Sequence, residues 1–544
     1  MNRPCVHRAT HFALHLALAL ALIAPVRAAD PVTLRGTILD AESGRPIPAR
    51  LYIESEAGGF LLAESVGGIA IAYDKARESS IEIHTSLSAH PFEVQLPPGR
   101  YTLRAERGKE YLPATATLEV DEDTAEIRLE LKRWIDMNAL GWFSGETHVH
   151  RPLEDLRTLM LCEDLNVGLP LTAWVSKLED TPLANNRNLG PLPAAALIEI
   201  DPTHVIWPLN TEYEIGSVAG KRHVLGALFV LNHKTPLDLP ALPARSIAIA
   251  ARRQGALLDL DKHNWPWSMM LAPAIQVDLF ELTNNHLWRA PFRFKDFYID
   301  YAPDYMELER DDEGFTERGW IDFGLQNYYA LLNCGLDIKP SAGTASGVHP
   351  VPLGFGRAYV KIRGPFSYDA WIAGLREGRS FVTTGPMLMV QFDGKDPGSR
   401  FSEEAVPSGS LRISGTAAAL HPMHAIEIVI NGEVARTIPV AGGKTESGAF
   451  GTSFDTLVDL PGSAWVAVRV FEDRPDGRAR FAHTAPVHVE IADSPLRPRR
   501  VEVEYLLGRV RDEIERHRGV LPPESLAEFR KAESFYQGLL EDAR

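Results

Sequence analysis

Two histidines separated by one residue give the clearest chemical signal in this sequence. His148 and His150 stand near the end of the segment 141–151, which reads as one strand end. In a β-strand, residues i and i+2 point to the same face, so both imidazoles can bind one metal ion through ring nitrogens. An isolated His-x-His pair is also common on protein surfaces, so the interpretation depends on further ligand-type residues downstream.

Such residues recur beside two apolar runs, Val224–Leu231 and Ala256–Leu260. They are Glu212, His223, Asp261, Lys262 and His263. Charged groups that crowd the ends of buried strands are costly unless they pair with one another or bind a metal. The joint pattern therefore predicts a metal centre. Cysteine cannot build it, because Cys5, Cys162 and Cys334 form no Cys-x-x-Cys pair.

With these motifs, the sequence resembles the polymerase-and-histidinol-phosphatase (PHP) metallohydrolases, and among them the secreted branch related to carbaryl hydrolase, the CehA/McbA-like proteins. The resemblance spans residues 134–386. The His148–His150 pair is similar to the first motif of the family, Glu212 with His223 to the second, and residues 261–263 to the third. The later stretches 327–335, 341–344 and 378–386 are also similar to that branch.

The resemblance implies a distorted (β/α)7 barrel that holds two divalent ions, with one or three ions as alternatives. Zn, Mn and Fe suit a site of His and carboxylate ligands about equally well. The implied reaction is hydrolysis of an ester, phosphoester, amide or carbamate bond by a metal-activated water. The substrate itself is not implied beyond a small molecule or a glycan.

The resemblance also implies roles for individual residues. The implied metal ligands are His148, His150, Glu212, His263, His223 and Asp155. Glu212 would bridge two ions, His223 would bind an ion or support a ligand, and Glu154 is an alternative to Asp155.

Catalytic roles fall on His349, Lys262 and Asp261. His349 or His263 would protonate the leaving group, and Lys262 or Arg357 would stabilise anionic charge. The alternative for Lys262 is a salt bridge with Asp259 or Asp261.

One position departs from the family pattern. The closing motif of the family is Asp-x-His, whereas Ala345 stands at the corresponding carboxylate position here. His349 follows shortly and could reach the site from a shifted turn. This departure leaves open a second function, in which a weakly metallated barrel acts as a glycan-binding or protein-binding protein.

A substrate pocket is expected from residues that follow the same apolar runs. Its members are His286, Trp265, Trp267 and Arg357, with Trp288 and Tyr328 nearby. Aromatic rings could line an apolar or sugar-stacking pocket, and packing in the core is the alternative.

The elements that must position these residues alternate along the chain. Apolar runs read as strands end in polar residues, and Leu325–Leu332 and Tyr368–Leu375 have helical periodicity. Strand, polar tip and helix in succession are typical of an α/β barrel that carries its active site at the strand ends.

All-β segments flank this region. Residues 29–133 read as short strands between turns and resemble the carboxypeptidase-regulatory-like β-sandwiches. Residues 387–497 read as a second β domain, in which Asn431-Gly432 predicts a hairpin. Residues 498–544 have charged helical periodicity and predict a helical tail that packs on the body, mediates association or stays solvated.

Composition agrees with a large exported protein. The chain has 544 residues, 45% of them hydrophobic, which is enough for several folded domains. A net charge of −16 disfavours nucleic acid as a partner. Residues 1–28 predict a signal peptide cleaved near Ala28, hence a secreted or periplasmic protein without an integral membrane anchor. The oligomeric state stays open.

Overall fold

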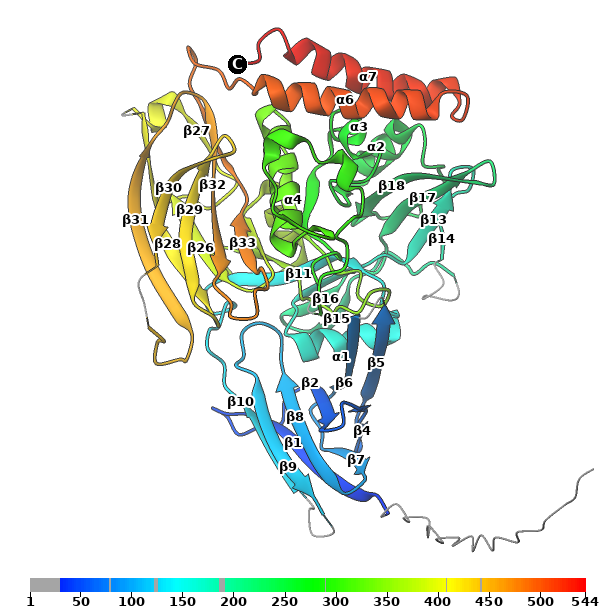
Figure 1. Ribbon diagram of the computed structural model, residues 1–544, viewed down its shortest axis with the longest axis vertical. Helices are drawn as coiled ribbons and strands as arrows, with labels where there is room; N and C mark the ends of the chain where they lie inside the picture. Colours follow the sequence, from blue (N-terminus) through cyan, green and yellow to red (C-terminus); the bar gives the residue numbers. More distant parts are fainter. Residues whose placement is uncertain are drawn as a thin grey trace, which may run out of the picture.

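The computed structural model describes residues 30–77, 80–121, 126–184, 191–288, 290–407, 409–440 and 443–544. The expected signal peptide, residues 1–28, lies outside them, as does Cys5. The chain forms an N-terminal β unit, a central mixed unit, a C-terminal β unit and two final helices (Figure 1). Within the described residues, no helix combines the length and apolar character needed to cross a membrane.

The N-terminal unit consists of two β-sheets with the strand orders β10-β1-β7-β4 and β5-β6-β2-β8-β9, with β3 beside β2. Alternate side chains of these strands, including Leu34, Leu51, Phe92 and Leu103, face inward and form one apolar core. The bounds are β1 Val32–Asp40, β2 Ala49–Ser55, β3 Phe60–Leu61, β4 Glu64–Ser65, β5 Ala70–Arg77, β6 Ser80–Leu87, β7 Phe92–Leu96, β8 Gly99–Glu106, β9 Ala114–Val120 and β10 Glu126–Leu131.

Most strands of the central unit lie in two sheets, and β21 pairs with β22 in a separate hairpin. Part of a twelve-stranded sheet has the order β15-β16-β12-β11-β24-β25, and a seven-stranded sheet has the order β14-β13-β17-β18-β19-β20-β23. The bounds are β11 Trp142–Val149, β12 Val167–Pro170, β13 Ala173–Lys177, β14 Leu183–Ala184, β15 Ile198–Asp201, β16 His204–Ile206, β17 Thr211–Val218, β18 Lys221–Leu231, β19 Leu257–Leu260, β20 Leu279–Thr283, β21 Arg310–Asp311, β22 Gly314–Phe315, β23 Lys339–Ala342, β24 Arg357–Lys361 and β25 Ser380–Thr383.

Helices cover these sheets, and the two sheets meet at the end of β11. The helices are α1 Leu153–Glu163, α2 Ala244–Arg253, α3 Ser268–Leu271, α4 Glu317–Asn333 and α5 Tyr368–Glu377. A parallel bridge joins Val149 to Ser346, which follows β23. Apart from the β21–β22 pair, the described strands of the central unit form two sheets joined by this bridge, so a closed (β/α)7 barrel stays a prediction.

The C-terminal β unit continues the twelve-stranded sheet. β25 pairs with β33, and from there the order is β33-β32-β29-β30, with β34 and β27 attached. A three-stranded sheet, β26-β28-β31, completes the unit. The bounds are β26 Met387–Phe392, β27 Arg400–Ser402, β28 Ser410–Ala419, β29 Met423–Ile430, β30 Glu433–Pro439, β31 Phe450–Asp459, β32 Ala464–Glu472, β33 Phe481–Thr484 and β34 Val487–Glu490.

The last two helices, α6 (Arg500–His517) and α7 (Pro523–Leu539), form an antiparallel pair across the central unit (Figure 1). The Glu528 carboxylate accepts the backbone N–H groups of Ala244 and Arg245 at the start of α2. The Tyr536 hydroxyl donates to the carbonyl of Met269. The C-terminal helices therefore pack on the body of the protein, and a solvated tail is excluded for this segment.

Candidate metal centre

A pocket of about 200 Å³ lies where β11, β17 and the segment after β19 meet the loop that follows β23. Five of the predicted site residues line it, His148, His150, Glu212, Lys262 and His349, together with Ala345. They come from segments far apart in the chain, and the sheets bring them together at one edge.

His148 lies on β11, and His150 follows the last residue of this strand. Every residue of β11 is buried, and β12 and β24 pair with its two edges. His148 and His150 share a face, and their ring centroids are 5.2 Å apart. Backbone bonds fix this end of the strand: Ala345 N–H donates to the carbonyl of His148 at 2.7 Å, and His150 N–H to the carbonyl of Ser346 at 2.9 Å.

Two groups of ligand-type side chains meet at His148. In the first group, a ring nitrogen of His148 and ligand atoms of His150 and Glu212 all lie within 4.8 Å of one another. In the second group, the same holds for ligand atoms of His148, Asp261 and Glu281. All five side chains are buried. β17 supplies Glu212, β20 supplies Glu281, and Asp261 follows β19 directly.

The contacts within these groups are close. His148 Nδ1 lies 2.7 Å from Glu281 Oε1 and 3.9 Å from Asp261 Oδ1, and His150 Nε2 lies 3.3 Å from Glu212 Oε2. Within the described part of the chain, Glu212 Oε2 and Glu281 Oε2 are buried and accept no hydrogen bond, although Glu212 Oε2 lies within ion-pair distance of His150. Buried carboxylate oxygens are normally satisfied by donors or cations. The donor set of imidazoles and carboxylates therefore fits a divalent transition metal.

The pKa values of Glu212 and Glu281 are also consistent with a cation site. Burial raises the pKa of Glu212 well above its usual range, and the nearby charges of Glu214 and Asp261 raise it further. Burial and Asp261 likewise raise the pKa of Glu281. Burial therefore favours the protonated form of both side chains, and a bound cation would favour their ionised form.

Lys262 supplies a positive charge inside the site. Its Nζ lies 2.6 Å from Asp261 Oδ1, and the Trp265 indole N–H donates to Asp261 Oδ2 at 2.7 Å. Burial opposes ionisation of Asp261, but Lys262 holds its pKa below the usual range. The ammonium group would therefore compete with a metal ion for the Asp261 carboxylate. This contact is one of the two salt bridges that the sequence offered for Lys262.

A glycine allows the two ligand groups to approach each other. A Cβ at Gly343 would lie 2.1 Å from the Cβ of His148 and 2.4 Å from Glu281 Oε1. Any other residue would push these two side chains apart, because real Cβ contacts are never so short. Gly343 follows β23 directly, so the loop that carries Ala345 and His349 begins against the metal ligands.

Two other predicted site histidines lie beside the ligand groups in an aromatic cluster. The His263 ring is 4.6 Å from Trp320 and 4.7 Å from Phe323 between centroids, and burial lowers its pKa to about 3. The His286 ring stacks on Phe294 at 3.7 Å. Among the described residues, His263 is in neither ligand group, and both of its ring nitrogens lack hydrogen-bond partners.

His223 lies away from the pocket, and strand pairing explains why. β17 and β18 are antiparallel, so Glu212 pairs with Phe229, whereas His223 lies near the hairpin turn that joins Val218 to Lys221. His223 Nε2 instead contacts His517 Nδ1 of α6 at 2.8 Å.

The remaining predicted residues also lie outside the ligand groups. Asp155 is half-buried in the first turn of α1. Arg357 is buried and donates to the carbonyls of Gly354, Glu163 and Asp164. Trp267 is fully buried in the core, and Trp265 covers Lys262 at 5.3 Å from its ring centroid.

Glu281 is the residue that sequence reasoning missed. It lies inside the apolar run Leu279–Thr283, which reads as an ordinary buried strand. A single carboxylate in such a strand is itself a signal, because an unpaired buried charge is costly. Its partner, however, is 133 positions away, and sequence spacing does not reveal it.

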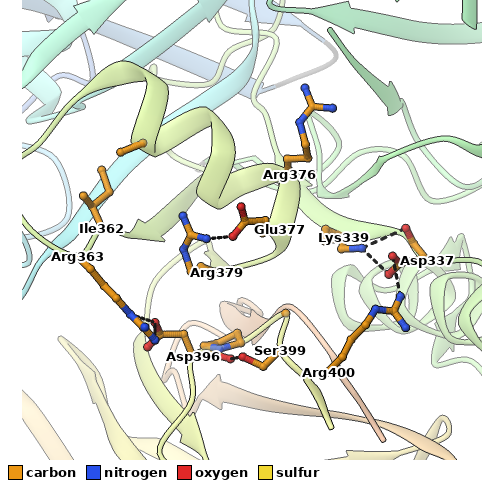
Figure 2. A pocket seen from close by; sticks show the side chains of 13 residues that line it. Asp337, Lys339, Ile362, Arg363, Arg376, Glu377, Arg379, Asp396, Ser399 and Arg400 are labelled. Atoms are coloured by element: carbon orange, nitrogen blue, oxygen red, sulfur yellow. Dashed lines mark hydrogen bonds and ion pairs between the residues drawn. The ribbon is translucent and has the colours of Figure 1, made fainter. Parts of the chain in front are cut away.

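A larger cavity, of about 610 Å³, lies between α5 and the segment before β27 (Figure 2). Its charged walls are already paired. Arg363 lies 2.7 Å from Asp396, and Arg400 lies 2.8 Å from Asp337. The cavity contains none of the ligand-type groups described above, so the small pocket remains the candidate site.

No protein-family model and no curated protein matches this chain. A solved structure from Bacteroides vulgatus, a two-domain protein containing a predicted PHP-like metal-dependent phosphoesterase, is similar over 64% of this chain and 96% of its own. The sequence identity is 10% and the TM-score 0.27. A TM-score of this size establishes neither a common fold nor a common chemistry.

Proposed function

We propose that this chain is an exported metal-dependent hydrolase of the PHP type, acting on an ester, phosphoester, amide or carbamate bond. One observation carries the proposal: five buried ligand-type side chains from distant segments of the chain form two groups that share His148, and three of them line one small pocket. The His148–His150 motif and its similarity to the first motif of the PHP family support the same assignment.

The proposal assigns a separate role to each of these residues. His148, His150 and Glu212 would hold one ion, and Asp261 and Glu281 would hold a second. His148 would bind only one of the two ions, because a neutral imidazole offers a single free nitrogen. A divalent ion supplies Lewis acidity, which makes water more acidic and polarises the oxygen of the bond to be cleaved. Lys262 would offset the negative charge that Asp261 brings to the site. The competition between Lys262 and a metal for Asp261 favours tighter binding at the first group.

The test is elemental analysis of the purified full chain, prepared without chelator. Wild type is compared with the double variant His148→Ala/His150→Ala and with His223→Ala, which removes a histidine outside the ligand groups. One or two divalent ions per chain, lost in the double variant and kept in His223→Ala, support the proposal. Less than one ion per chain in wild type, even after added Zn or Mn, overturns it and favours a binding protein.

The bond class is tested on the metal-loaded protein. The probes are p-nitrophenyl phosphate, bis-p-nitrophenyl phosphate, p-nitrophenyl acetate and an N-methylcarbamate ester. Turnover of one probe that disappears in the double variant assigns the class. A metallated protein without turnover of any of these probes would contradict the hydrolase part of the proposal for these bond types.

A further inference from the structure

The N-terminal β unit reaches the metal pocket through the β5–β6 hairpin. The Tyr73 hydroxyl on β5 donates to the backbone carbonyl of His349 and accepts the N–H of Gly347 at 3.3 Å. The guanidinium of Arg151, one residue after His150, lies 3.8 Å from the centroid of the Tyr73 ring. The Ser80 hydroxyl on β6 donates to the carbonyl of Pro291 at 2.9 Å. The hairpin therefore holds the loop that carries His349.

The last residue of β5 contacts the His349 ring itself. Arg77 Nη1 lies 3.1 Å from His349 Nδ1. A guanidinium has only donors, so His349 Nδ1 must accept this hydrogen bond. A neutral imidazole carries its proton on the other nitrogen when one nitrogen accepts. His349 is thereby restricted to the tautomer with hydrogen on Nε2.

His349 lines the same pocket as the proposed metal ligands, so its orientation matters to whatever enters that pocket. Burial lowers the pKa of His349 well below its usual range, and the charges of Arg77 and Lys262 lower it further. The ring is therefore neutral near pH 7. Its Nε2–H is the one ring donor left after the contact with Arg77.

We propose that Arg77 is a positioning residue: it fixes the Nε2–H tautomer of His349 so that the ring donates a hydrogen bond to an oxygen of the bound substrate. What binds in the pocket rests on the proposed function, whereas the tautomer does not. In this proposal the N-terminal unit is a structural part of the active site, and an oxygen-rich group such as a phosphoryl or carbonyl ester is the matching ligand chemistry.

The tautomer is measured directly by NMR on the full chain labelled with [15N]histidine. The His349 signals are assigned by their loss in His349→Gln. We expect a pattern of protonated Nε2 and unprotonated Nδ1 in wild type, which changes toward a tautomer mixture in Arg77→Met. Arg100→Met removes an exposed arginine of the same unit and should change nothing. A protonated Nδ1 in wild type, or an unchanged His349 signal in Arg77→Met, overturns the proposal.

Turnover of the probe that wild type cleaves gives the second readout. Arg77→Met should lower kcat about tenfold, the factor that one ordinary hydrogen bond corresponds to, while metal content and melting temperature stay constant. Arg77→Lys keeps a donor and should recover most of the loss. An unchanged kcat in Arg77→Met overturns the role in positioning. If wild type cleaves no probe, the proposed function fails, and the NMR result still decides the tautomer.

Discussion

Glu281 Oε1 lies 2.7 Å from His148 Nδ1, although 133 positions separate the two residues. A carboxylate on one ring nitrogen of a histidine fixes the ring and makes the other nitrogen a better metal ligand. The contact forms because β20 and β11 both end at the loop that begins with Gly343. Glu281 thus belongs to the metal centre either as a ligand or as the partner that orients His148.

Glu281→Gln tests this relationship. The change keeps the size of the side chain and removes its charge, so Zn affinity should fall about 10- to 100-fold, the usual effect of losing such a carboxylate. Isothermal titration calorimetry measures the Zn affinity, with protein from which a chelator has removed the bound metal. Asp259→Asn is the control: Asp259 is also a buried carboxylate on a neighbouring strand, but it accepts from Ser341 and is in neither ligand group. Equal affinity losses in both variants would contradict a specific role for Glu281.

Gly343→Ala should disturb both the fold and the metal centre. The new methyl group would overlap His148 and Glu281 Oε1, and overpacking of this kind costs about 1–3 kcal/mol. The expected results are a lower melting temperature and weaker Zn binding. Gly508→Ala on α6 meets no atom within 4 Å and should instead stabilise the protein by up to about 1 kcal/mol. A fully metallated Gly343→Ala protein of wild-type stability would show that the loop can move.

His483 should make the protein less stable in acid. It is fully buried on β33, where Nδ1–H donates to the carbonyl of Thr484 and Nε2 contacts the Tyr329 hydroxyl at 2.9 Å. Burial lowers its pKa from 6.5 to about 3. The unfolded chain therefore binds a proton that the folded chain excludes, and stability falls as the pH drops from about 6.5 toward 3.

Between pH 7 and pH 5 this one group accounts for a loss of about 2 kcal/mol. His483→Gln should remove that part of the pH dependence, measured as a flatter curve of melting temperature against pH. His424→Gln, an exposed histidine on β29, controls for the substitution. The same slope in wild type and His483→Gln would show that other groups account for the acid sensitivity.

Glu528→Gln tests how the C-terminal helices hold the central unit. The Glu528 carboxylate caps α2 by accepting the N–H groups of Ala244 and Arg245, so loss of its charge should cost about 1 kcal/mol. Denaturant unfolding followed by Trp fluorescence measures the change. Glu524→Gln, an exposed residue in the first turn of α7, should have no effect of this size. Equal costs at both positions would rule out the cap as the cause.

Local patterns in the sequence predict much of the local structure. The two-residue period of a strand places His148 and His150 on one face, as the structure shows. The Asn431-Gly432 pair predicts the turn between β29 and β30, where Ile430 pairs with Glu433. Helical periodicity in the last fifty residues corresponds to α6 and α7. These features depend on neighbours in the chain, which the sequence displays directly.

What the sequence does not predict depends on pairing between distant segments. His223 stands close to Glu212 in the chain, but the antiparallel pairing of β17 and β18 puts them at opposite ends of the hairpin. Glu281 and Gly343 meet His148 only because three strand ends converge. The contact between Arg77 and His349 joins the N-terminal and central units. The packing of one unit on another produces no periodic pattern in the sequence, so the sequence does not predict this contact.

The ladder between β25 and β33 joins the central and C-terminal units into one twelve-stranded sheet. A single proteolytic cut in the link between β25 and β26 would therefore leave both fragments bound to each other. Gel filtration would return one particle, while a denaturing gel would separate two bands. The C-terminal unit therefore cannot be exchanged between proteins as an independent domain. Its removal would break the pairing of a sheet that also contains β11, the strand that carries His148.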